Sequence, residues 1–91
     1  MNLSNMDVST GAQGYRVCIG KDYPGPIKLP EVKEMVRQWT EEFGIPPKEC
    51  VLSFRVINDR TIDRLHELGV TTVRSTGGIL AWEVYLGPTH P

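Results

Sequence analysis

The sequence predicts an α+β fold of the order β-α-β-α-β-β, a two-layer sandwich with two helices on one face of a four-stranded mixed sheet. Three observations predict it. One long segment has an apolar stripe of helical period, a shorter stripe of the same kind follows later, and four short runs alternate as strands do. Because each helix has a single apolar stripe, both are expected to cover the same face of the sheet.

An alternating run over residues 15–19 predicts the first strand. Tyr15, Val17 and Ile19 would form its buried face. The next residues, 20–28, contain a Pro-Gly-Pro sequence that interrupts both helix and strand, so a loop is expected there.

The organising element is a helix expected over residues 29–44. Pro30 suits the first helical position, where its missing N–H has no intrahelical partner, and Gly44 suits the residue after the end. The apolar stripe is spaced by four, three and four residues, and consists of Val32, Val36, Trp39 and Phe43. This stripe should pack against the sheet.

A strand over residues 50–57 and a helix over residues 60–68 are expected next. Asn58 or Asp59 can cap that helix by accepting a hydrogen bond from a free first-turn N–H, and Gly69 can end it. The strand would bury Leu52, Phe54 and Val56, and the helix would bury Ile62, Leu65 and Leu68.

Two final strands, over residues 70–75 and 79–86, are expected to form an antiparallel hairpin that turns near Gly77-Gly78. The first two strands, if adjacent, would be parallel with a right-handed crossover. These assignments together predict a core of Val17, Ile19, Val32, Val36, Trp39, Phe43, Leu52, Phe54, Val56, Ile62, Leu65, Val73, Leu80, Trp82 and Val84.

The length of 91 residues predicts a single domain, expected over residues 15–87. Residues 1–14 have no apolar period, which predicts a flexible N-terminal tail, and residues 88–91 should fray. The hydrophobic fraction of 40% and the charged fraction of 23% are those of an ordinary globular protein.

The formal net charge of −1 argues against a protein that binds nucleic acid or anionic membrane by overall charge. No apolar run is long enough for a transmembrane helix, and the N-terminus lacks the pattern of a signal peptide. Two cysteines are too few for a secreted disulfide scaffold. We therefore expect a cytoplasmic protein with two reduced thiols.

No motif indicates catalysis, a metal or a cofactor, so a non-enzymatic protein is expected. The two histidines, His66 and His90, do not have metal-ligand spacing. Cys18 and His66 could act as nucleophile and base only if the fold joined them, and strand parity places Cys18 opposite the helices. An anion site at the start of the first helix is disfavoured, because Pro30 lacks a donor and Glu31 and Glu34 would repel a phosphate.

The order of elements resembles that of the small sulfur-carrier proteins, which place a Cys-Pro-x-Pro motif before their first helix. The corresponding sequence here is Asp22-Tyr23-Pro24-Gly25-Pro26, without a cysteine. Sulfur transfer is therefore not expected, and the resemblance is one of topology only.

The sheet face that the helices leave uncovered, called the open face below, is the candidate functional surface. Strand parity assigns to it Arg16, Cys18, Ser53, Arg55, Ile57, Val70, Thr72, Arg74, Glu83 and Tyr85. Of these we expect a binding site formed by Arg16, Arg55, Arg74, Glu83 and Tyr85, because arginine and tyrosine dominate interface energetics.

The expected function is a small binding or regulatory domain that acts through protein–protein interaction, as a monomer or a homodimer and without a membrane. The alternative is a nucleic-acid-binding module that uses the open face and the C-terminal hairpin.

Overall fold

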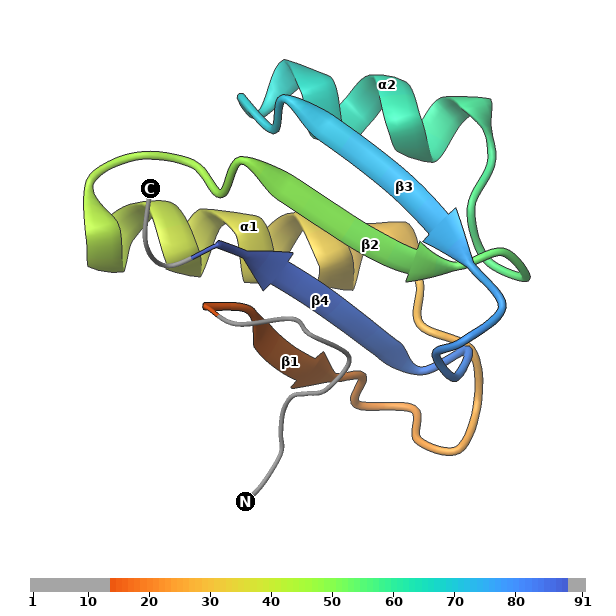
Figure 1. Ribbon diagram of the computed structural model, residues 1–91. Coiled ribbons are helices and arrows are strands. Elements are labelled where there is room, and N and C mark those ends of the chain that lie inside the picture. The colour runs from red at the N-terminus through yellow and green to blue at the C-terminus, as the bar shows by residue number, and fades with distance from the viewer. Residues whose placement is uncertain (1–13, 89–91) are drawn as a thin grey trace.

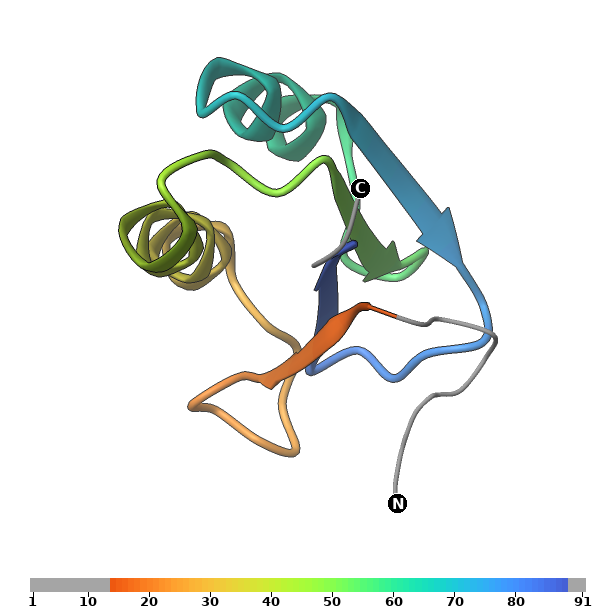
Figure 2. The same ribbon diagram turned by 60° about the vertical axis from the view of Figure 1, so that its left-hand side comes forward.

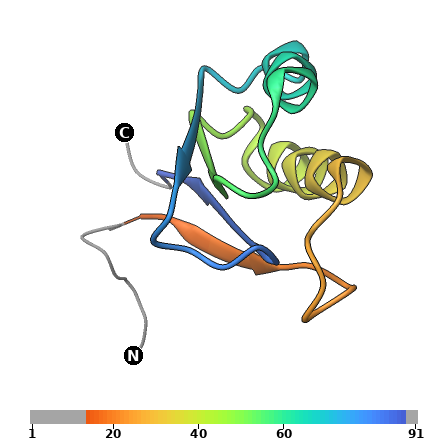
Figure 3. The same cartoon turned by 90° about the vertical axis from the view of Figure 1, so that its right-hand side faces the viewer.

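The structure is a computed structural model that describes residues 14–88, and it confirms the predicted fold class. One mixed sheet carries two helices, and Figures 1, 2 and 3 show both helices on the same side of it. In chain order the elements are β1 Arg16–Ile19, α1 Leu29–Phe43, β2 Glu49–Ser53, α2 Asp59–Glu67, β3 Thr72–Thr76 and β4 Glu83–Gly87. The tail expected over residues 1–14 and the frayed end expected over 88–91 lie outside the described residues, apart from Gly14 and Pro88.

Helix α1 begins and ends where its sequence predicts. Pro30 lies in its first turn, and Gly44 adopts a left-handed conformation with φ 81°. The Gly44 N–H donates to the Thr40 carbonyl at 2.8 Å, which satisfies one of the free carbonyls of the last turn. Local residue chemistry is therefore sufficient to define this helix.

Helix α2 is capped by Asn58, whose side chain accepts a hydrogen bond of 2.9 Å from the Thr61 N–H. Beyond its end, Gly69 has φ 99° and lies against the neighbouring connection. A Cβ atom at Gly69 would approach Pro46 Cγ to 2.6 Å. Only glycine satisfies both the backbone angle and the close approach.

The strand order in the sheet is β1-β4-β2-β3, so the expected β3–β4 hairpin is wrong. Strand β3 instead pairs in parallel with β2, and β4 pairs antiparallel with both β1 and β2. After β3 the chain passes the end of β2 and enters the gap between β2 and β1 (Figure 1). Strands β1 and β2 thus run in the same direction, but they are not adjacent.

Burial explains why the last strand lies inside the sheet. Val84 and Leu86 of β4 are fully buried, whereas β3 consists mostly of exposed polar residues. The observed order places the apolar strand β4 inside the sheet and the polar strand β3 at an edge, which keeps the apolar side chains of β4 out of water.

Several core assignments need correction. Val32, Val36, Trp39, Leu52, Leu65 and Val84 are buried as expected. Strand β2 ends at Ser53, where the Val56 N–H donates to the Ser53 carbonyl in a turn, so Phe54 emerges with 58% of its surface exposed. Strand β4 begins only at Glu83, which leaves Leu80 exposed in the preceding loop and Trp82 half-buried against Tyr23. The errors at Phe54, Leu80 and Trp82 come from assigning to a strand residues that lie outside its ladder, after Ser53 in β2 and before Glu83 in β4.

Trp39 is the largest side chain that α1 buries, with 3% of its surface exposed. We expect Trp39→Ala to lower the free energy of unfolding by about 3–5 kcal/mol, because it removes buried area and leaves a cavity. Phe43→Ala is the matched control, since Phe43 lies one turn later on the same helix with 41% exposed; its cost should be about 1 kcal/mol. Urea unfolding measures both, and equal losses would contradict the assignment of Trp39 as the anchor.

Candidate functional site

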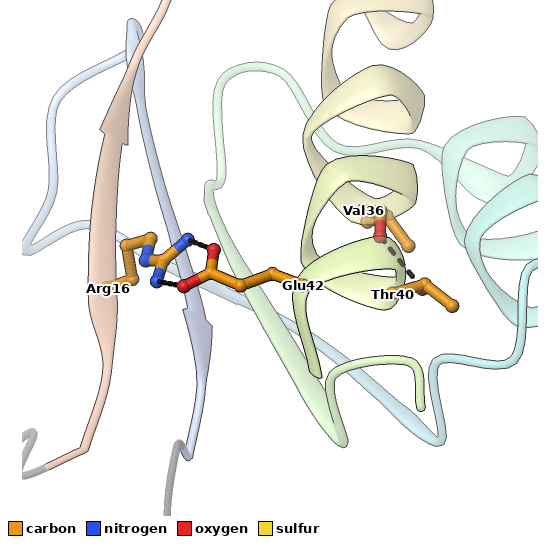
Figure 4. A network of polar contacts seen from close by, with 4 residues as sticks. All are labelled: Arg16, Val36, Thr40 and Glu42. Carbon is orange, nitrogen blue, oxygen red and sulfur yellow. Dashed lines mark hydrogen bonds and ion pairs between the residues drawn. The ribbon is translucent and has the colours of Figure 1, made fainter. Parts of the chain in front are cut away.

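Strand β1 has the opposite orientation to the one expected. Cys18 packs against the core, and Arg16 points toward the helix layer, where its guanidinium donates to Glu42 of α1 at 2.8 and 3.0 Å (Figure 4). The same guanidinium lies 5.4 Å from the Trp39 ring and 5.3 Å from the Phe43 ring. Arg16 therefore joins the two layers and does not belong to the open face.

The reversed orientation turns Val17 and Ile19 outward, with 41% and 50% of their surfaces exposed. Val17 lies opposite Tyr85 of β4, and Tyr85 lies opposite Val51 of β2. These four residues, Val17, Ile19, Val51 and Tyr85, are called the open-face strip. It runs from the edge strand β1, where Val17 and Ile19 are exposed, through the half-buried Tyr85 to Val51, which is buried with 5% of its surface exposed.

A polar cluster borders this strip. The Tyr15 hydroxyl donates to one carboxylate oxygen of Glu49, and the Arg74 Nε–H donates to the other. Burial is the main cause that raises the pKa of Tyr15, and the bond to Glu49 raises it further. The same carboxylate raises the pKa of Arg74. The cluster links the start of β1 to β2 and β3 across the open face.

The structure therefore brings three of the five expected binding residues, Arg74, Glu83 and Tyr85, to the open face. Arg16 is on the helix side. Arg55 lies in the turn after β2, and its guanidinium is 5.9 Å from the exposed Phe54 ring. The remaining residues of the strip, Val17, Ile19 and Val51, were not among the expected site residues, because alternation alone assigned the first two to the core.

This placement removes most of the basis for a nucleic-acid site on the open face. Such a site needs free cations and exposed aromatic rings on one surface. Arg16 is bound to Glu42 on the other side, and Arg74 is bound to Glu49. The C-terminal hairpin that the nucleic-acid alternative would use is not formed either, because β3 and β4 are not neighbours in the sheet.

Both cysteines lie at the core, Cys50 buried and Cys18 half-buried. Burial raises the pKa of Cys18, and it raises that of Cys50 to about 12, so both are neutral thiols at pH 7. The His66 Nδ1 lies 2.8 Å from the Val70 carbonyl oxygen, which identifies this nitrogen as the protonated one. Within residues 14–88 no hydrogen bond joins Cys18 to His66.

Two further properties can be stated for the described part of the chain. Among residues 14–88, no group of three or more histidine, cysteine, aspartate or glutamate side chains could hold a metal ion. In the same range, neither helix has the length and apolar character needed to cross a membrane.

Comparison of the chain with protein-family models, with curated proteins and with solved structures gives no match. By its fold and its open-face strip, the protein is a small α+β domain with apolar residues exposed on an edge strand. The function proposed below is inferred from these features.

The buried Cys50 thiol makes stability depend on alkaline pH. Its pKa is about 12 in the folded protein against 9.0 for the free side chain, so the unfolded chain ionises first and is stabilised as the pH rises. From about pH 9 to about pH 10, the unfolding free energy of the natural protein should fall by about 1 kcal/mol more than that of Cys50→Ala. Urea unfolding at both pH values measures this, and identical slopes would show that Cys50 ionises freely.

Proposed function

We propose that the protein is a small, non-enzymatic binding or regulatory domain that recognises a partner protein through the open face along β1 and β4. The observation that carries the proposal is the outward orientation of Val17 and Ile19 on an edge strand, next to the half-buried Tyr85. Exposed apolar residues that form a continuous track favour an interface over a solvated surface.

The position of the strip favours an extended segment of the partner. Among the described strands, β1 pairs only with β4, so none of them pairs with its outer backbone groups, which is the edge that an added strand uses. A segment added there would gain main-chain hydrogen bonds from β1 and would place alternate side chains over Val17 and Ile19. Strand addition thus uses both features of this edge at once.

The borders of the strip would provide specificity. Glu83 lies opposite Ile19 in the ladder, and the Glu49–Arg74 pair lies beyond Val51. Polar groups around an apolar centre are the usual arrangement of a protein interface. The neutral thiols and the hydrogen-bonded His66 support a role in binding without chemistry.

The test is capture of a partner from cell extract, followed by its identification and by titration of the purified pair. We expect Ile19→Glu to weaken the measured affinity at least about tenfold, because it replaces the most exposed apolar residue of the strip with a charge beside Glu83. Ile45→Glu is the matched control: Ile45 is 60% exposed and lies beyond the far end of α1, so this variant should bind normally.

Two results would contradict the proposal. If Ile45→Glu abolishes binding and Ile19→Glu does not, the partner docks at the end of α1 and not on the open face. If capture disappears with nuclease treatment and falls steeply with salt, the ligand is a nucleic acid. Circular dichroism of each variant shows that the fold is retained.

A further inference from the structure

A second surface lies on the helix side of the sheet, in a groove of about 480 Å³ between the first turns of α1 and α2. Its apolar lining includes Ile27, Leu29 and Val56. A volume of this size is in the range that accommodates a small organic ligand. The groove does not include any residue of the open-face strip.

The charged residues that line this groove are all basic. Lys28 comes from the loop before α1, Lys33 from α1, and Arg60 and Arg64 from α2. No carboxylate is part of the lining. Two chain segments that are distant in the sequence, residues 28–33 and residues 60–64, thus contribute four cations to one concave surface.

Two of these cations, Lys33 and Arg60, have no ion-pair partner among the described residues. Arg64 pairs with Glu67 at 2.9 Å, and Lys28 lies 3.7 Å from Asp22, both at exposed positions where an ion pair is weak. Within residues 14–88, Lys33 and Arg60 have no carboxylate partner. The groove therefore has an excess of positive charge that an anionic ligand would neutralise.

Glu31 and Glu34, the two residues from which the sequence analysis argued against an anion site, do not line this groove. The Glu31 carboxylate accepts a hydrogen bond from the Lys21 N–H, and Glu34 binds Arg37 and Gln38. Both carboxylates line a different depression, on the β1 side of α1. These two carboxylates therefore do not line the groove itself, although the two depressions share Lys28 and Pro30.

We propose that this groove binds a phosphorylated small molecule, with the phosphate at Lys33 and Arg60 and the organic part against Ile27, Leu29 and Val56. Guanidinium and ammonium groups together favour a dianion such as a phosphate monoester over a single carboxylate. At the start of α2 the Thr61 N–H already donates to the Asn58 side chain. The proposed recognition of the phosphate therefore relies on the basic side chains.

The observations favour a small phosphate over a nucleic-acid strand. A strand would need a basic track that continues beyond the groove, whereas the neighbouring depression contains Asp22, Glu31 and Glu34. The formal net charge of −1 agrees with a basic site of limited extent.

The test uses the full chain and adenosine 5′-monophosphate as the probe, with adenosine as its uncharged counterpart. Titration followed by amide chemical shifts should move the signals of Lys33, Arg60 and their neighbours, and adenosine should not. We expect the double variant K33Q/R60Q to weaken binding of the probe by about tenfold or more, since it removes two charged hydrogen-bond donors. Arg37→Gln, on α1 but outside the groove, should bind as the natural protein does.

Four outcomes would overturn the proposal: shifts confined to the open face, equal binding of adenosine, an equal loss in Arg37→Gln, or no shift at millimolar probe. A fifth, tight binding of an oligothymidylate with no response to the monophosphate, would show that the ligand is a nucleic-acid chain. Circular dichroism of K33Q/R60Q separates loss of binding from loss of fold. Ile19 does not line the groove. The binding test with the monophosphate and the binding test with the protein partner can therefore fail independently.

Discussion

The structure depends on the insertion of β4 between β1 and β2. Val84 and Leu86 of this strand are fully buried, and its backbone pairs on both sides. The centre of the sheet is therefore complete only when β4 lies between β1 and β2. The same insertion moves β1 to an edge, and β1 is the strand that carries the exposed valine and isoleucine. The proposed protein interface is thus a consequence of where the last strand lies.

The loops at one end of the sheet connect the two proposed surfaces. The Gly20 N–H donates to the Trp82 carbonyl at 2.8 Å, and the Ile27 N–H donates to the Ala81 carbonyl at 2.9 Å. These bonds tie the segment after β1, which leads into the basic groove, to the turn that precedes β4. The groove on the helix side and the strip on the open face therefore share one framework, although their residues differ.

Arg16 shows how an edge strand is held with little core of its own. Its guanidinium donates two hydrogen bonds to the Glu42 carboxylate and lies over two aromatic rings of α1, while Cys18, on the same side of β1, packs against the core. The ion pair raises the pKa of Arg16 and lowers that of Glu42, although solvent limits the energy of so exposed a pair. The pair connects the inward-facing side of β1 to α1, beside Cys18, which packs against the core.

The sequence by itself determined the helices, their ends and the fold class, because these depend on neighbours three or four residues apart. The Val32–Val36–Trp39 stripe repeats every three or four residues, and the Asn58 cap and the Gly44 terminus each act within one turn. Only the tertiary structure decided the strand order, the face of β1 and the convergence of Lys33 with Arg60, since each depends on residues distant in the chain. A run of four strand residues with an arginine and a cysteine on one side and two aliphatic residues on the other does not specify its buried face. In the folded protein the face with arginine and cysteine meets the helices, where Arg16 bonds Glu42, 26 residues away in the chain, and Cys18 packs against the core.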